Sequence, residues 1–413
     1  MEYYDTITDE YLKLIKTSSM RVVKVKLELL NVWEKTIGEI VNDLSSTEGS
    51  ININSEQGCR RTCSISVIDK DRKYIPTSDS PFWYNRKFKI YIGLKAPSGN
   101  LYWFSQGVFY NQEATANGRQ ININGVDKFG LLNGELKTCM LNVEFSAKVD
   151  YLKKNVKIVD LIREILMMNI GNGIPIDPVE PLIDPKFYNL VLKNDIVVEE
   201  GSYVGEIFTK IAEMYSVNIY YDIHGKLRME EIFNADRPLW YEHLAPIYDF
   251  GEVDISEDEL NVGYAFEGVN IVTVTTDNPD GKIYSATAKN TNPLSPINVE
   301  SVGYRRYEGS TYTIPLISQS EVNSLNTSQT QICLAQAQYL LLQSCCDNLS
   351  ISFDYPIIPH LDVDNNVRLS NKYFGFDGDL FLLKSITINL GLQPMSLSLM
   401  NIQWLPYDNF SET

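Results

Sequence analysis

Residues that commonly carry out chemistry are scarce in this sequence. Its 413 residues include three histidines (His224, His243 and His360) and six cysteines, which leaves few bases, nucleophiles or metal ligands. Phosphate-loop, GxSxG and HExxH motifs are missing, so the common nucleotide-binding, serine-hydrolase and zinc-protease sites are not expected. An enzyme is therefore the less favoured class. We assign no catalytic, cofactor-binding or metal-binding residue and expect no cofactor.

Positive charge is also in short supply. Lysine and arginine number 36 against 53 aspartates and glutamates, which gives a net charge of −17. A protein that grips a nucleic-acid backbone needs a basic face. The pairs Arg60-Arg61 and Arg305-Arg306 are too isolated to form one. Nucleic-acid binding as the main task is not expected.

Long hydrophobic runs and an export signal are absent as well. No run approaches the ~18 apolar residues of a membrane-spanning helix, and the N-terminus lacks the basic and apolar regions of a secretory signal. Cys59 and Cys63 lie four positions apart in what we interpret as a strand, about 13 Å between Cα atoms and too far for a disulfide. No second Cys/His pair follows at zinc spacing. We expect six free thiols and no membrane association.

What the sequence has in abundance is alternation of apolar and polar residues. In Val22–Leu30 (VVKVKLELL) the apolar side chains share one face and the charged side chains the other, as in a half-buried antiparallel strand. A short helix is predicted over Asp9–Lys16. Further strands are predicted at Ser50–Asn54, Arg61–Asp69, Lys87–Leu94, Tyr102–Tyr110 and Gln120–Val126. Six strands in this stretch indicate a barrel or a sandwich.

The pattern changes in the middle of the chain. Val156–Met168 and Tyr203–Tyr215 have helical spacing of apolar residues. Two short strands, Val217–Tyr221 and Lys226–Glu231, are joined by a turn in which we interpret His224 as a turn residue. This stretch predicts a compact α+β unit.

Strands return in the C-terminal part. They are predicted at Asn261–Thr276, Lys282–Asn290, Ser350–Tyr355, Asn366–Leu369, Asp379–Leu390 and Pro394–Trp404. The helix expected over Gln329–Cys346 is apolar most of the way round, so it should pack between layers. The fold class is therefore mainly β with an α+β insertion. We expect domains at 1–145, 146–235 and 236–413.

Two acidic motifs are candidate sites. Asp362-Val363-Asp364-Asn365-Asn366 resembles the start of a calcium loop, but Val367 and Tyr373 stand where that loop needs Gly and Glu. The cluster Glu252–Glu259 offers paired carboxylates of the kind used in glycoside hydrolysis. In both cases a solvated turn is the favoured interpretation.

The order of the segments resembles that of phage tail and baseplate hub proteins. The matching runs are Gly49–Asn54, Arg60–Asp69, Trp103–Tyr110, Asn124–Gly134, Gly201–Met229, Ala286–Pro296, Val299–Tyr304, Pro356–Asp362, Val367–Ser370, Phe381–Leu390 and Met395–Met400. The resemblance implies two tail-tube-like antiparallel β-barrel modules, at 1–145 and 236–413, with the smaller α+β domain between them.

The same resemblance implies a structural role without catalytic residues. Three copies would form a homotrimer with pseudo-sixfold symmetry that joins a sixfold tail tube to a threefold central spike. The implied partners are the tail tube protein, the spike and other baseplate proteins, in a virion tail or phage-tail-like particle assembled in the host cytoplasm. If DNA or a tape-measure protein passes through the ring, we expect acidic side chains to outnumber basic ones on the channel wall, because a basic wall would bind phosphates. The alternatives are a tail-tip cell-wall hydrolase and a glycan- or receptor-binding tail protein.

Overall fold

The computed structural model describes most of the chain. The described residues are 7–17, 21–43, 48–136, 156–169, 173–192, 196, 202–231, 247–251, 260–264, 269–277, 283–305, 311–315, 328–346, 349–391 and 394–401, without positions 57, 81, 83–85, 216, 294 and 296. Every structural statement below concerns these residues.

The N-terminal part is a run of antiparallel strands preceded by one helix. Its elements are α1 (Asp9–Thr17), β1 (Val22–Leu30), β2 (Thr36–Asp43), β3 (Glu48–Asn54), β4 (Arg61–Ile68), β5 (Lys87–Lys95), β6 (Leu101–Asn117), β7 (Gln120–Asp127) and α2 (Phe129–Leu132). All six strands predicted here are present. The strand β2 was missed, because Ile37 and Val41 are exposed and Gly38 interrupts the alternation that marks a half-buried strand.

The middle part is the predicted α+β unit. Its elements are β8 (Val156–Lys157), α4 (Ile158–Leu166), β9 (Leu182–Ile183), the 3₁₀ turn η2 (Pro185–Phe187), β10 (Val191–Leu192), α5 (Gly205–Tyr215), β11 (Val217–Tyr221) and β12 (Leu227–Glu231). The amphipathic spacing of α4 buries one face of the helix. His224 lies in the β11–β12 turn as predicted, and its backbone N–H donates to Asp222 Oδ1 at 2.8 Å.

The C-terminal part contributes strands to two sheets. Its elements are β13 (Tyr248–Phe250), β14 (Asn261–Tyr264), β15 (Ile271–Asp277), β16 (Ser285–Lys289), α6 (Val299–Val302), β17 (Thr311–Pro315), α8 (Gln329–Cys346), β18 (Leu349–Tyr355), β19 (Asn366–Asn371), β20 (Phe376–Leu390) and β21 (Met395–Asn401). The helix α8 lies against β15 and β16 through Cys333, Ala337 and Leu341, while Ile332 also contacts the core of the middle unit. It therefore packs between layers, as predicted.

One predicted strand was wrong. The run Asn261–Thr276 was expected to be continuous, but β14 pairs with β18 in the large sheet and β15 pairs with β16 and β17 in a separate one. Asn270, just before β15, is fully buried and donates from Nδ2 to the carbonyl oxygens of Ile297 and Gly303. A loop rather than a strand partner holds the chain at this point.

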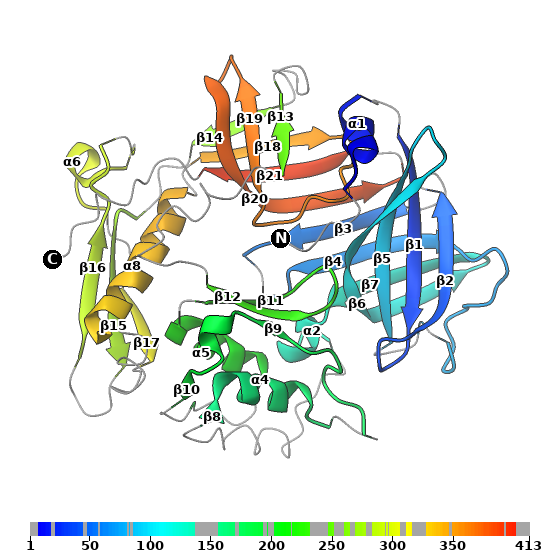
Figure 1. Cartoon of the computed structure of the whole chain (residues 1–413), viewed down its shortest axis with the longest axis horizontal. Helices are drawn as coiled ribbons and strands as arrows, with labels where there is room; N and C mark the ends of the chain where they lie inside the picture. The colour runs from blue at the N-terminus through cyan, green and yellow to red at the C-terminus, as the bar shows by residue number, and fades with distance from the viewer. Residues whose placement is uncertain are drawn as a thin grey trace.

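The large sheet has 13 strands, drawn from the N-terminal and the C-terminal parts of the described residues. Its order is β14-β18-β21-β20-β3-β4-β7-β6-β5-β1-β2, with β19 pairing β20 and β13 pairing β19 (Figure 1). The strands β3 and β20 are antiparallel, in a register that runs from Ser385 opposite Asn54 to Leu390 opposite Gly49. We call this pairing the seam, because it joins the N-terminal and C-terminal halves.

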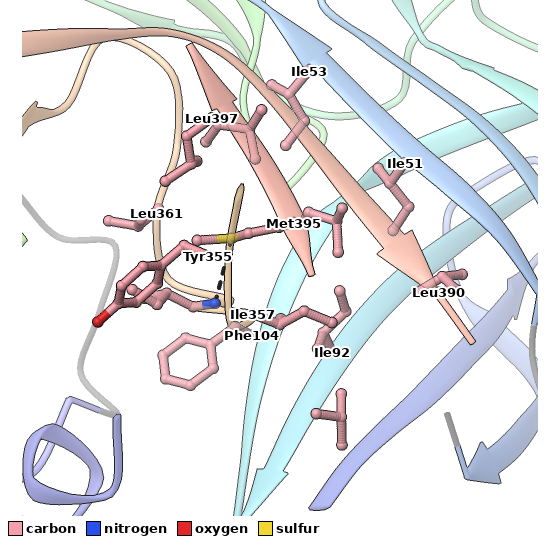
Figure 2. Close-up of a cluster of buried hydrophobic side chains, with 14 of the residues drawn as sticks. Ile51, Ile53, Ile92, Phe104, Tyr355, Ile357, Leu361, Leu390, Met395 and Leu397 are labelled. Atoms are coloured by element: carbon pink, nitrogen blue, oxygen red, sulfur yellow. Dashed lines mark hydrogen bonds between the residues drawn. The ribbon is translucent and has the colours of Figure 1, made fainter. Parts of the chain in front are cut away.

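A single hydrophobic core lies beneath the seam. Figure 2 shows Ile51 and Ile53 from β3 beside Leu390, Met395 and Leu397 from the C-terminal strands. Burial of such side chains contributes about 1.5–3 kcal/mol each relative to exposure. The mainly β fold with large antiparallel sheets and few helices is thus confirmed. The domain boundaries at 1–145, 146–235 and 236–413 stay a prediction.

Candidate assembly surface

One face of the large sheet carries short polar side chains on six consecutive strands. The positions are Ser350, Ser352 and Asp354 in β18, Ser396 and Ser398 in β21, Ser385, Thr387 and Asn389 in β20, Ser50, Asn52 and Asn54 in β3, Thr62, Ser64 and Ser66 in β4, and Gln120, Asn122 and Asn124 in β7. We call this the polar face. It forms because each strand alternates, and the opposite residues of each strand enter the core.

The polar face crosses the seam without interruption. Ser398 lies opposite both Ser352 and Ser385, and Ser385 lies opposite Asn54 on the other side of the seam. Asp354 is the single charged residue among the positions named above, and Ser396 donates to it at 2.6 Å. The same face continues to Glu48 at the start of β3 and to Glu113 in β6, opposite Asn124.

The composition of this face limits what it can bind. Protein interfaces draw most of their affinity from buried Trp, Tyr and Arg anchors, and phosphate binding needs cations. The polar face has neither at the positions named. Hydroxyl and amide groups of this kind bond readily to water, so the face suits contact with solvent.

Two sequence motifs dismissed as sites meet in the structure. Arg61, at the start of β4, is 1% exposed and bonds both carboxylate oxygens of Asp362, at 2.7 and 2.6 Å. Arg60 pairs with Asp364 at 2.8 Å, and its guanidinium lies 3.8 Å from the ring centre of Tyr220 in β11. The acidic run is a turn before β19, but its carboxylates are held by arginines rather than solvated. These contacts connect all three parts of the chain.

A second buried group of charges fixes the middle unit to the first strands. The ammonium of Lys128 contacts Glu34 Oε1 at 2.6 Å, Asp177 Oδ1 at 2.6 Å and the carbonyl oxygen of Gly225 at 2.7 Å. Lys128 is 1% exposed. Its three protons thus have three acceptors, one from the β1–β2 turn and two from the middle unit. Lys87 adds a 2.7 Å contact to Glu34.

The electrostatics of this group favour the carboxylate form of Glu34, whereas burial lowers the pKa of Lys87. Burial raises the pKa of Glu34, but the ammonium groups of Lys128 and Lys87 outweigh burial and lower the pKa overall. This cluster was not predicted from the sequence. The one available signal was a lysine flanked by residues that enter the core, in Val126-Asp127-Lys128-Phe129.

The helix α1 forms a third contact between the N-terminal and C-terminal halves. Tyr11 is fully buried, and its hydroxyl lies 2.6 Å from Nδ1 of His360. The rings of Phe104 and Tyr248 also face His360. Burial lowers the pKa of His360 to about 4, so this histidine is neutral at physiological pH.

The remaining candidates give no site among the described residues. Cys59, Cys63 and Cys333 are free and buried, and Cys59 precedes β4 rather than lying in it. The side chains of the other three cysteines, His243 and the cluster at 252–259 lie outside the described residues. Within the described part of the chain no group of three His, Cys, Asp or Glu is arranged to hold a metal ion. No helix there has the length and apolar character to cross a membrane.

Comparison with known proteins identifies the fold. No protein-family model matches the sequence, and no curated protein matches it. Among solved structures, the chain is similar to a tail protein from Neisseria meningitidis MC58, at a TM-score of 0.56 and 12% identity, covering 94% of this chain and 99% of that one.

Two further structures show the same likeness. One is the 43 kDa tail protein of prophage MuSo2 from Shewanella oneidensis, with a TM-score of 0.54 and 11% identity over 94% of this chain and 100% of that one. The other is a chain of the half-lidded Francisella PdpA–VgrG complex, with a TM-score of 0.53 and 10% identity over 96% of this chain and 60% of that one. The chain has the fold of phage tail proteins.

Proposed function

We propose that this chain is a structural hub protein of a phage tail or phage-tail-like particle. The observation that carries the proposal is the likeness to two tail proteins along nearly their whole lengths. The location that follows is the tail or baseplate of the particle. The partners proposed are the tail tube protein, the central spike and other baseplate proteins.

The seam supports a ring of three copies. In each copy the seam holds two β-rich halves in one continuous sheet. Three such copies around an axis would present six β-rich halves, which is the arrangement needed to match a sixfold tube on one side and a threefold spike on the other. Closed rotational symmetry also prevents open-ended polymerisation.

We propose that the polar face lines the channel of this ring. A channel wall must let its cargo pass without holding it, and short hydroxyl and amide side chains offer neither apolar anchors nor cations. Asp354, Glu48 and Glu113 are acidic residues on this face, and the lysine next to it in β20, Lys384, is paired with Glu56. We expect acidic side chains to outnumber basic ones on this wall, so that it repels the phosphates of DNA.

The test is the assembly state of the purified full-length chain. Sedimentation equilibrium is expected to give a trimer, and averaged electron-microscope images should show a threefold ring with a central opening. Addition of the tube protein should place a sixfold ring on one face. A monomer at all concentrations, or a ring of six identical copies, would overturn the proposal.

A further inference from the structure

The large sheet ends in two strands that are open on one side. Within the described residues β2 pairs only with β1, and β14 pairs only with β18. Figure 1 shows β2 at the right of the large sheet and β14 at its upper left. An open strand presents a row of backbone N–H and C=O groups that can pair with another strand.

The strand β2 has only part of the usual protection of a sheet edge. Proteins protect such edges with lysine, proline, bulges or very short strands. β2 has eight residues, none of them Lys or Pro. It carries one bulge at its beginning, where Ile37 is the extra residue between the pairs Leu30–Thr36 and Leu29–Gly38, and it pairs regularly with β1 from Gly38 on. Its side chains Ile37 and Val41 are 53% and 43% exposed, and Trp33 in the preceding turn is 49% exposed. Apolar exposure along an open edge marks an interaction site.

We propose that the edge of β2 pairs with the edge of β14 from a second copy of this chain, so that the sheet continues from copy to copy. This inference rests on the proposed ring and goes further by naming the strands that close it. Charge favours this pairing over β2 with β2. A twofold contact of β2 with β2 that is centred on Glu39 would bring this exposed carboxylate near its own counterpart, and like charges on facing strands are destabilising. Asn261, Val262 and Gly263 in β14 carry no charge.

The two edges are different, which decides the symmetry of the assembly. A contact between unlike surfaces repeats head to tail, and it gives a closed ring when the rotation between copies closes. A contact of β2 with itself would instead give a twofold dimer. The pairing of β2 with β14 is thus compatible with three copies around an axis.

The first experiment changes the β2 edge. The double variant Ile37→Lys/Val41→Lys adds the lysines that protect natural edges and should raise the dissociation constant of the trimer about 10-fold or more in sedimentation equilibrium. The matched control is Met167→Lys/Ile283→Lys, which adds the same charge at residues 59% and 68% exposed on other parts of the chain. The control should remain trimeric. Circular dichroism checks that both variants are folded.

The second experiment captures the contact directly. With a short thiol-specific cross-linker, the variant Glu39→Cys/Asn261→Cys should give covalent dimers and trimers, while each single variant gives the background seen with the unmodified chain. A different result is that the unmodified chain is a trimer, while the lysine variant dissociates no more than its control and the double cysteine variant gives no cross-linked dimers or trimers. That result would show that the edge pairing is wrong, and it would leave the proposed trimeric ring in place. Cross-linking of Glu39→Cys alone would show β2 against β2 and overturn the inference. A monomeric unmodified chain overturns both proposals.

Discussion

Thr387 in β20 donates a hydrogen bond from Oγ1 to Oδ1 of Asn52 in β3, at 3.1 Å, although the two residues are 335 positions apart. They lie opposite each other in the seam, on the polar face. The next pair along the seam, Ile386 and Ile53, faces the core, and each is 1% exposed. The seam thus places one polar surface and one apolar surface across both halves of the chain.

The first prediction concerns cooperativity. Ile386→Ala should lower the free energy of unfolding by about 3 kcal/mol, because it removes buried methyl groups and leaves a cavity. Unfolding should stay a single transition, since the two halves share one core. Urea titration followed by both tryptophan fluorescence and circular dichroism, at fixed protein concentration, tests this. Ile283→Ala, at a residue that is 68% exposed and lies outside the proposed contact, is the control, with an expected change below about 0.5 kcal/mol. Separate transitions for the two probes would contradict the shared core.

The second prediction concerns the buried ammonium. Lys128→Met should cost about 3–5 kcal/mol, because Glu34 and Asp177 would lose the charge between them. Limited proteolysis should then cut the middle unit faster than in the unmodified chain. Lys73→Met, which removes an ion pair more than 60% exposed on both sides, should cost at most about 1 kcal/mol. If both variants lost the same free energy of unfolding, the burial of Lys128 would not explain its contribution to stability.

The third prediction concerns the arginine at the junction. Arg61→Lys should destabilise the chain, because both contacts to Asp362 come from Nη2, whose position at the end of the planar guanidinium a lysine ammonium does not match. The double variant Arg61→Met/Asp362→Leu should recover a large part of the loss seen with Arg61→Met alone, since it leaves no isolated charge. A double-mutant cycle by thermal unfolding measures the coupling. Additive effects would indicate that the ion pair contributes nothing.

The fourth prediction is a pH dependence. Burial holds the pKa of His360 at about 4, below its ordinary 6.5, so the folded state binds fewer protons than the unfolded state between these values. The contribution of this neutral histidine is complete above pH 6.5. It falls by about 3 kcal/mol as the pH drops to about 4. His360→Gln should weaken this slope in urea titrations at pH 7 and pH 5. An unchanged slope would assign the pH dependence to other groups.

The fifth prediction concerns the proposed channel. Asn52→Lys/Ser64→Lys/Ser398→Lys should give the ring an affinity for duplex DNA that falls steeply with salt, because each new phosphate contact releases counterions. The unmodified chain should bind weakly under the same conditions. Fluorescence anisotropy at two salt concentrations measures the difference. Tight binding by the unmodified chain would contradict a wall that lets phosphate pass.

Local patterns in the sequence were enough to predict most elements. The alternation in Val22–Leu30 gave β1 with the bounds that the structure shows, and the helical spacing in Val156–Met168 gave α4 within a few residues. When a strand or helix buries one face, its apolar residues recur with the period of that element, so the pattern can be recognised in the sequence. These patterns were sufficient to predict the mainly β class of fold and the packed helix α8.

Long-range relationships could not be predicted in this way. Nothing in Arg60-Arg61 indicates that its partners are Asp364 and Asp362, because an ion pair between distant residues leaves no periodic trace. The polar face could not be predicted for a similar reason. The sequence of each strand shows only the alternation within that strand, whereas packing sets the register between strands across the seam. The strand β2 was missed because its exposed Ile37 and Val41 break the rule by which buried strands are recognised.

The seam also determines when the sheet can be completed during synthesis. β3 is made early, whereas its partner β20 follows more than three hundred residues later, as the 335-residue separation of Asn52 and Thr387 shows. At ribosomal rates this is a delay of roughly 20 to 70 s, during which one side of β3 has no native neighbour. Such non-local pairing makes folding slow. A nascent chain with β3 open is exposed to pairing with other chains, so we expect folding of this protein to depend on chaperones more than that of a β protein with local pairings.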